Sequence, residues 1–329
     1  MKPLIDICVP TYNPQPQHLK EALDNIRAQT LQDWTVFIHD DASHVDVAAM
    51  VKPYLTDPRF SFERGIKRRG IGGNWNTCVR HGHATFVQLL FQDDRWDKSY
   101  LARAAKVLQS DETIGMVSAN HQHLTLDGKP ATGIYEEIKT EWQKLKSGKY
   151  DGQGFLFTWL QKGLRPNIIG EPSFVMLRRS CMDTAGPFLT DMSQLLDSEY
   201  WVRMLLIGQW YWTSENGGVF RVHASGASAK NSASGRGALD RLRTLQRLIT
   251  YLPVKEDRLR AMDVHNDELR AMIRKFFRSS QEKQQTEKKG DGRPNIFHPK
   301  HIPLFLTAIK HYVQRIPARR KMRATRKVA

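Results

Sequence analysis

Short apolar runs alternate with helical patterns through the first half of this 329-residue chain. The runs LIDICVP, DWTVFIHDD, RFSFERG and TFVQLLFQDD each end at polar or turn residues, as buried strands do. Helical patterns separate them in HLKEALDNIRAQT, GGNWNTCVRHG and LARAAKVLQSD. This alternation is typical of a mostly parallel sheet with helices on both faces. We therefore predict an α/β fold, in which ligands bind beyond the carboxyl ends of the strands.

The charge of the chain is unevenly distributed. The last part, from Lys230 to Ala329, holds 25 lysines and arginines against 9 acidic residues, which accounts for the whole net charge of +16. We therefore expect a first domain of residues 1–229 and a basic helical C-terminal region of residues 230–329. Within that region, residues 279–299 are poor in apolar side chains, which predicts a flexible linker. Residues 305–316 carry one apolar helical face.

The cysteines and the N-terminal residues bear on the compartment. Cys8, Cys78 and Cys181 lie far apart with no C-x-x-C spacing, which indicates a reducing compartment and no structural zinc. The first residues lack the pattern of a signal peptide, and no apolar run approaches the roughly 18 residues of a transmembrane helix. We expect a cytoplasmic protein, with peripheral attachment to the inner face of the membrane as the alternative.

Two adjacent carboxylates, Asp93 and Asp94, close the apolar run LLFQDD. Paired acids at the end of a buried strand offer the oxygen ligands that suit Mg²⁺ or Mn²⁺. Such a metal can stabilise a leaving diphosphate. The pattern also fits an N-cap of the helix predicted after DDRWDKSYL, because an Asp side chain accepts bonds from free backbone N–H groups.

Two earlier strands also end in polar motifs. HDDAS, at residues 39–43, closes the second strand, where a carboxylate can accept bonds from a nucleobase or a ribose hydroxyl. VPTYN, at residues 9–13, closes the first strand. Each motif alone also fits an ordinary turn, because Asp, Asn and Pro are turn residues.

In order and spacing, PTYN, DDAS, GIGGNWN and QDDRW resemble the motifs of the family 2 glycosyltransferases, which are nucleotide-sugar enzymes with the GT-A fold. The resemblance covers roughly residues 4–225. It implies a metal site, for Mg²⁺ or Mn²⁺, made by Asp93, Asp94 and His223. It also implies nucleotide-sugar binding by Pro10, Thr11, Tyr12, Asn13, Asp40, Asp41, Asn74, Asp93, Glu199 and Arg203.

The downstream motifs extend this resemblance. LLDSEYWVR is similar to the family's acidic pair before W-x-R, which implies that Asp197 is the general base for the acceptor hydroxyl. Acids in a first helical turn are also favoured by the helix dipole alone. FRVHASGAS is similar to the family's R-x-H pattern, so His223 either helps to hold the metal or diphosphate or is a loop histidine with no such role. Phe91 stands where many members have the first acid of D-x-D, which leaves metal binding to Asp93 and above all Asp94.

The resemblance implies transfer of a sugar from a nucleoside diphosphate-sugar donor to a hydroxyl acceptor. By analogy with the family we expect inversion at the anomeric carbon, a glycan or lipid-linked acceptor, and a role in polysaccharide or glycoconjugate synthesis. A sugar nucleotidyltransferase is an alternative, but VPTYNPQPQ lacks the Gly-rich basic loop typical of that class.

The basic C-terminal region leaves further alternatives. It could bind nucleic acid, although it has neither zinc-finger spacing nor an RNP-type motif. A basic amphipathic helix fits an anionic membrane surface better. An appendage for oligomerisation or solubility is the remaining alternative.

Two further motifs, RRGIGGN and HQH, resemble ligand-binding patterns only in part. RRGIGGN fails the G-x-G-x-x-G fingerprint because Trp75 holds its last position, so we interpret it as a turn near the donor site. HQH places His121 and His123 at metal-like spacing, but no nearby carboxylate in the sequence completes a site. We therefore expect a solvated or core-edge histidine pair.

Overall fold

The computed structural model describes residues 2–192, 194–223, 236–282, 303–307 and 309–311. The chain divides into two compact units. The first contains Met1–Phe157, Pro166–Met192 and Leu196–His223, and the second contains Thr158–Arg165, Ser193–Leu195 and Ala224–Ala329. The domain boundary expected near residue 230 falls outside the described residues, and the short segment Thr158–Arg165 groups with the second unit.

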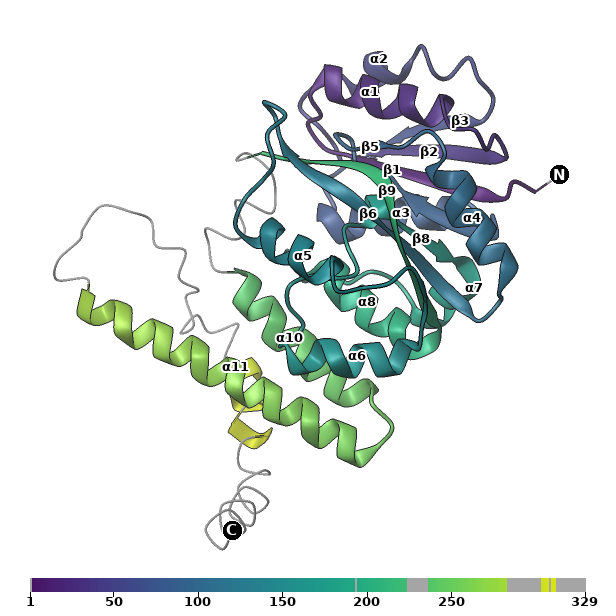
Figure 1. Ribbon diagram of the computed structural model, residues 1–329. Coiled ribbons are helices and arrows are strands. Elements are labelled where there is room, and N and C mark those ends of the chain that lie inside the picture. The colour runs from purple at the N-terminus through teal and green to yellow at the C-terminus, as the bar shows by residue number, and fades with distance from the viewer. Residues whose placement is uncertain (1, 193, 224–235, 283–302, 308, 312–329) are drawn as a thin grey trace, which may run out of the picture. The chain divides into compact units, whose positions relative to one another are not determined.

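The described part of the first unit contains a nine-stranded mixed sheet (Figure 1). Its order is β3-β2-β1-β4-β8-β6-β9-β5, with β7 paired to β9. The strands are β1 (Ile5–Thr11), β2 (Trp34–Asp40), β3 (Phe60–Arg64), β4 (Phe86–Leu89), β5 (Arg95–Trp96), β6 (Ile114–Thr125), β7 (Gly148–Tyr150), β8 (Val175–Arg178) and β9 (Gln209–Val222). Strands β3, β2, β1 and β4 run parallel to one another, while β8 runs antiparallel to both β4 and β6, between which it lies. The predicted α/β fold is confirmed.

Helices connect these strands and cover the sheet (Figure 1). They are α1 (Pro16–Arg27), α2 (Val47–Val51), α3 (Gly70–His81), α4 (Tyr100–Ser110), α5 (Ile134–Trp142), α6 (Gly152–Gln161), the 3₁₀ helix η1 (Pro172–Phe174), α7 (Arg179–Ala185) and α8 (Leu196–Ile207). Helix α1 begins with Pro16, whose fixed φ suits the first helical position, and it buries Leu19, Leu23 and Ile26 as their spacing predicts. Helix α3 packs on β1 and β2, and α4 packs on β6.

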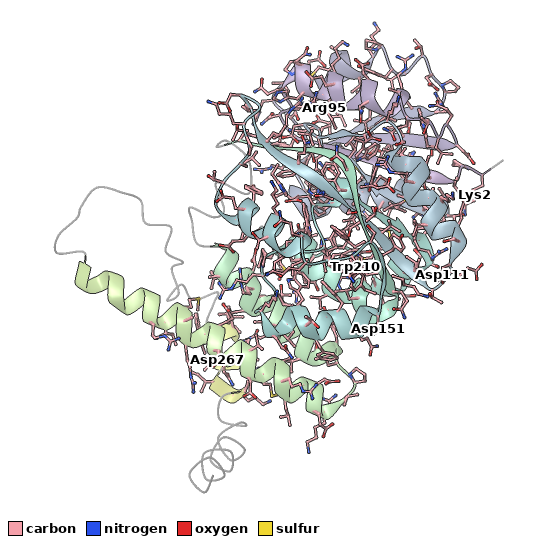
Figure 2. All side chains as sticks on the ribbon, in the orientation of Figure 1. Lys2, Arg95, Asp111, Asp151, Trp210 and Asp267 are labelled. Atoms are coloured by element: carbon pink, nitrogen blue, oxygen red, sulfur yellow. The ribbon has the colours of Figure 1, made fainter. Side chains whose placement is uncertain are left out.

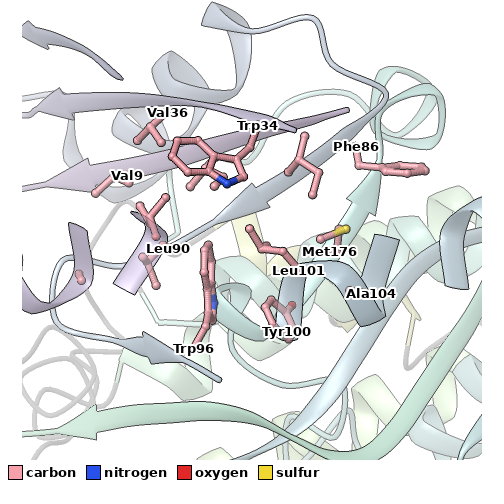
Figure 3. Packing of buried hydrophobic residues seen from close by; sticks show 14 of the residues in the cluster. Val9, Trp34, Val36, Phe86, Leu90, Trp96, Tyr100, Leu101, Ala104 and Met176 are labelled. Atoms are coloured by element: carbon pink, nitrogen blue, oxygen red, sulfur yellow. The ribbon is translucent and has the colours of Figure 1, made fainter. Parts of the chain in front are cut away.

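The main core lies between the sheet and its helices. Figure 3 shows part of it, with Trp34 on β2 and Tyr100 and Leu101 on α4 among the buried side chains. Trp210, marked in Figure 2, donates its indole N–H to Ser118 Oγ at 2.7 Å. Burial of such aromatic side chains is the main stabilising contribution, and it fixes the strand ends that carry the polar motifs.

The described part of the second unit is helical. It contains α10 (Arg236–Tyr251), α11 (Lys255–Glu282) and helical residues 303–307 and 309–311. Leu242, Leu269, Met272 and Leu304 belong to its apolar cluster. Helix α11 continues through residues 279–282, where the sequence predicts a linker. The rest of the predicted linker, and residues 312–316 of the predicted apolar helix, lie outside the described residues. Among the described helices, none combines the length and the apolar character needed to span a membrane.

Candidate functional site

The first two strands end side by side and their last residues are tied together. Thr11 ends β1 and pairs in register with Asp40, which ends β2, and Pro10 is buried one residue earlier. The buried Asp40 carboxylate accepts bonds from the Ser43 hydroxyl and from the Ser43 backbone N–H, the latter at 3.1 Å. Its Oδ2 also lies 3.7 Å from Nε of Arg64. Asp40 therefore shapes the turn after β2, which is the structural interpretation that the sequence left open.

The turns after β1 and β2 contain strained backbone. Asn13 and Ala42 have φ values of 46° and 57°, a region that residues other than glycine seldom adopt and that is common at ligand-binding turns. The Asn13 N–H donates to Ser43 Oγ at 2.7 Å, and Asn13 Oδ1 accepts the His44 N–H at 2.8 Å. The PTYN and DDAS motifs thus form one interlocked pair of turns.

Asp41 fixes the start of α3 against these turns. Its two oxygens accept the backbone N–H groups of Arg69 at 2.6 Å and Gly70 at 2.9 Å. Gly70 has φ of +76°, and a Cβ on Gly72 would lie 2.2 Å from the carbonyl oxygen of Leu189. The glycines of RRGIGGN therefore serve a tight helix start and a close backbone approach.

Asn74 on α3 contacts both strand ends. Its Nδ2 donates to the carbonyl of Thr11 at 3.1 Å, and its Oδ1 lies 2.7 Å from Nδ1 of His39. Beside it, the guanidinium carbon of Arg68 lies 4.3 Å from the centroid of the Tyr12 ring, a cation–π distance. Arg68 belongs to an exposed basic loop that the motif comparison missed, and the KRR run before the glycines was its signal.

Asp93 meets His223 at the end of β9. Asp93 Oδ2 lies 2.8 Å from His223 Nε2, although 130 residues separate them in sequence. Their side chains are 20% and 25% exposed. The two therefore form a partly exposed pair that offers one oxygen and one nitrogen as possible metal ligands. Arg221 supports this pair by donating a hydrogen bond to the carbonyl of Asp93 at 3.0 Å.

Asp94 has a different environment from its neighbour. It is fully buried, and its carboxylate accepts the Ser173 hydroxyl at 2.6 Å and the backbone N–H of Arg221 at 3.2 Å. Burial raises its pKa well above the usual range, and the adjacent charge of Asp93 adds to the effect. The sequence favoured Asp94 as the main metal ligand, but the accessible carboxylate is that of Asp93.

Asp197 lies in the first turn of α8 and is partly exposed. Its Oδ2 accepts Nδ2 of Asn167 at 2.9 Å, and its Oδ1 accepts the Ser198 N–H at 2.7 Å. Burial raises the pKa of Asp197 to about 7; the charge of Glu171 adds to the shift, and the Ser198 N–H opposes it. A carboxyl with a pKa near neutrality is suited to accept a proton from a hydroxyl.

The segment from residue 167 to residue 173 connects the two carboxyls just described. At its start, Asn167 bonds Asp197 and also donates to the carbonyl of Gly170 at 3.0 Å. The same carbonyl accepts the indole N–H of Trp201 on α8 at 3.0 Å. At its end, Ser173 bonds the buried carboxylate of the acidic motif. We name residues 167–173 the connecting segment; the motifs gave no sign of its role.

Glu199 and Arg203 face the interior. Glu199 is fully buried and accepts Nη2 of Arg203 at 2.8 Å and Nε at 3.1 Å. Arg203 also donates to the carbonyl of Ala185 at 2.5 Å and lies over the Tyr200 ring. The resemblance implied nucleotide-sugar binding by this pair, whereas its mutual bonds and burial favour a role in fixing α8.

The histidines of HQH do have a carboxylate partner, contrary to our expectation. Glu171 Oε2 lies 2.5 Å from His121 Nε2, and Oε1 lies 3.1 Å from His123 Nε2. Among the described residues, these three side chains form a group that could hold a metal ion, because their possible ligand atoms all lie within 4.8 Å of one another. Glu171 is 50 residues from His121, so spacing along the chain could not reveal it.

Comparison with known proteins identifies relatives of this chain. The model of the family described as glycosyl transferase family 2 matches residues 6–160. Uncharacterized protein MT1568 of Mycobacterium tuberculosis is 30% identical over 253 residues, which cover 77% of this chain and 76% of that protein.

Two solved structures have the same fold. The first is S. aureus TarS 1-349 in complex with UDP-GlcNAc, with a TM-score of 0.64 and 15% identity over 97% of this chain and 82% of that one. The second is the mannosyltransferase PcManGT from Pyrobaculum calidifontis in complex with GDP-Man and Mn²⁺, with a TM-score of 0.57 and 17% identity over 95% of this chain and 86% of that one. At these identities the likeness shows the fold alone, which is that of the GT-A enzymes.

Proposed function

Because the chain belongs to glycosyl transferase family 2 and is a glycosyltransferase of GT-A fold, we propose that it transfers a sugar from a nucleoside diphosphate-sugar to a hydroxyl acceptor with inversion. The acceptor would be a glycan or a lipid-linked saccharide, and the pathway polysaccharide or glycoconjugate synthesis. UDP-GlcNAc and GDP-Man, bound in the two structural neighbours, represent the donor class.

One observation carries this proposal. The connecting segment bonds Asp197 through Asn167 and Asp94 through Ser173, so a carboxyl with a pKa of about 7 is tied to the acidic motif by one short piece of backbone. Transfer needs a proton acceptor on one side of the sugar and a site for the leaving diphosphate on the other. The arrangement supports that division of roles.

The acceptor step follows from the environment of Asp197. A sugar hydroxyl attacks the anomeric carbon of the donor, its proton passes to an Asp197 oxygen, and the bond from that carbon to the diphosphate oxygen breaks. Asn167 and the Ser198 N–H orient the carboxylate. A base ionised around neutral pH combines the correct protonation state with useful basicity.

The nucleotide would bind at the interlocked turns after β1 and β2, with Tyr12, Asn13 and Asp41 nearest to it. Asp41 is buried in this structure, and its oxygens each retain a lone pair beside their backbone bonds, so a nucleobase or ribose donor would reach the carboxylate by entering between the two turns. The exposed loop with Lys67 and Arg68 adds positive charge for the diphosphate.

Asp93 and His223 fit a divalent ion, because both side chains are partly exposed and adjacent; their 2.8 Å contact is a hydrogen bond in this structure, which an ion bound to both atoms would replace. Carboxylate oxygen suits Mg²⁺ and Mn²⁺. When bound, such an ion would neutralise charge on the diphosphate leaving group. Asp94 would support this pair from the interior through its bond to the Arg221 backbone N–H.

Release of nucleoside diphosphate tests the function directly. The full chain is incubated with UDP-glucose, UDP-GlcNAc or GDP-mannose, with and without Mn²⁺ and with a mixture of saccharide acceptors. We expect one donor to release its nucleoside diphosphate, and Asp197→Asn to reduce that release by roughly a hundredfold or more. Equal release by Asp197→Asn would contradict the assigned base, and a retained anomeric configuration in the product would contradict inversion.

A further inference from the structure

Glu171 lies in the middle of the connecting segment, between the two carboxyls that the proposed function uses. It lies two residues before Ser173, which bonds Asp94, and four residues after Asn167, which bonds Asp197. A third carboxylate at this position repels the other two and is costly to bury. Such a group indicates a role that the fold alone does not require.

Two histidines hold this carboxylate in place. His121 and His123 are two residues apart on β6 and so lie on the same face of the sheet. Each contacts a different oxygen of Glu171, at 2.5 Å and 3.1 Å. His121 Nδ1 lies 2.9 Å from the carbonyl of Ala119, so it must carry a proton to donate there. A further proton is therefore shared between His121 Nε2 and Glu171 Oε2; burial lowers the pKa of His121, and the carboxylate of Glu171 opposes that shift.

Aromatic packing fixes the orientation of the histidines. The His121 ring stacks on Phe174 with centroids 3.9 Å apart and an interplanar angle of 16°. The His123 ring stacks near Trp142 at 5.5 Å and 20°. Although burial raises the pKa of Glu171, the two histidines outweigh it and hold that pKa well below its usual range. The carboxylate is thus ionised, oriented and 13% exposed.

These distances are those of hydrogen bonds. A metal with ligand bonds of about 2.1 Å in tetrahedral geometry would separate its donor atoms by roughly 3.4 Å. The contacts of Glu171 are shorter, and each histidine faces a separate oxygen. Glu171 is therefore a carboxylate that accepts two hydrogen bonds from the histidines and keeps further lone pairs for a third partner.

We propose that Glu171 binds a hydroxyl group of the donor sugar, and that His121 and His123 position it for this contact. The inference rests on the proposed function, in which the transferred sugar lies between the diphosphate and the base. An ionised carboxylate can only accept hydrogen bonds, so its partner must be a donor such as a sugar hydroxyl. The diphosphate is not the partner of Glu171, because both are negatively charged. The nucleoside is not the partner either, because in the proposed function it binds at the turns after β1 and β2.

Isothermal titration with paired ligands isolates this contact. The full chain with Mn²⁺ is titrated with UDP, UDP-glucose, UDP-GlcNAc, GDP and GDP-mannose, as wild type, Glu171→Gln and Glu137→Gln. Glu137 lies exposed on α5 and provides the matched change of charge. We expect Glu171→Gln to leave the Kd of the nucleoside diphosphate within about twofold and to weaken its sugar derivative by roughly tenfold or more. Glu137→Gln should change neither.

The possible results are distinguishable. Wild-type affinity of Glu171→Gln for the sugar derivative, or equal loss for both ligands, would overturn the role of Glu171 and leave the proposed function standing. Failure of wild type to bind any of the five ligands would overturn both. One equivalent of zinc in the purified protein, measured by mass spectrometry and lost in Glu171→Gln, would also overturn it, because Glu171 would then be a metal ligand.

A second variant keeps the test decisive if Glu171→Gln does not fold. His123→Phe keeps the aromatic packing beside Trp142 and removes the hydrogen bond to Oε1. We expect it to keep the affinity for the nucleoside diphosphate and to lose part of the additional affinity for the sugar. An unchanged additional affinity would contradict the positioning role of His123.

Discussion

Three carboxyl groups of the candidate site differ sharply in their environments. Asp93, Asp94 and Asp197 are chemically identical, yet one is accessible and paired with His223, one is buried, and one has a pKa near neutrality. The motifs located all three residues. The sequence could not show that Asp93 is accessible and Asp94 buried, because this difference depends on Ser173 and Arg221, which are distant along the chain.

The pKa of Asp197 predicts a pH dependence of activity. The carboxyl must be ionised to accept the hydroxyl proton, and burial raises its pKa to about 7. We expect kcat/KM to rise as pH increases through about 7 and to level off above it. Rates measured between pH 5.5 and 8.5 provide the profile, with Asp183→Asn, a change at an exposed position on α7, as control. A flat profile in wild type would contradict the assignment of the base.

The pKa of Asp94 predicts a pH dependence of stability. Its pKa is raised in the folded state above about 3.9, its value in unfolded chains, so ionisation costs folding free energy as pH rises above that value. Asparagine has no such cost. Without metal or nucleotide, Asp94→Asn should therefore gain stability relative to wild type as pH increases from 5 to 8. Urea unfolding at several pH values measures this difference, and a relative loss at pH 8 would contradict it.

At the scale of elements, α8 contains a buried ion pair between Glu199 and Arg203, and Arg203 also bonds the carbonyl of Ala185 at the end of α7. Breaking a buried pair leaves an unpaired charge and typically costs about 3–5 kcal/mol, whereas an apolar replacement of both partners is often neutral. We expect Glu199→Leu alone to lower the free energy of unfolding by about 3 kcal/mol and Arg203→Met added to it to restore most of that loss. Chemical denaturation of the single and double variants decides this, since additive losses would exclude the coupling.

The elements themselves were well predicted where local pattern determines them. The strands that end in Thr11 and Asp40 and the helix entered at Gly70 follow from apolar runs and turn residues. The antiparallel insertion of β8 between β4 and β6 was not foreseen, because strand order depends on pairing over long distances. The contact of His121 with Glu171 was not predicted for the same reason, because the two residues are distant along the chain.

At the scale of the whole molecule, the basic residues after Lys230 have no assigned role in the site. Such a region is attracted to anionic lipid surfaces, by about 1 kcal/mol for each Lys or Arg near the surface. We propose that it attaches the enzyme to a membrane. We expect flotation of the full chain with vesicles rich in phosphatidylglycerol, and release as salt increases. Equal recovery with neutral phosphatidylcholine vesicles would contradict an electrostatic attachment.

We propose that this chain binds a nucleoside diphosphate with a divalent ion at Asp93 and His223. Thermal unfolding of wild type and Asp93→Asn, with UDP, GDP, dTDP or CMP and either Mn²⁺ or EDTA, tests it most directly. A ligand at 100 times its Kd stabilises the folded state by about 2.7 kcal/mol. We predict that one nucleoside diphosphate raises the midpoint of wild type with Mn²⁺ but not with EDTA, and not that of Asp93→Asn. The same shift in Asp93→Asn, or none with any nucleotide in wild type, would contradict the account.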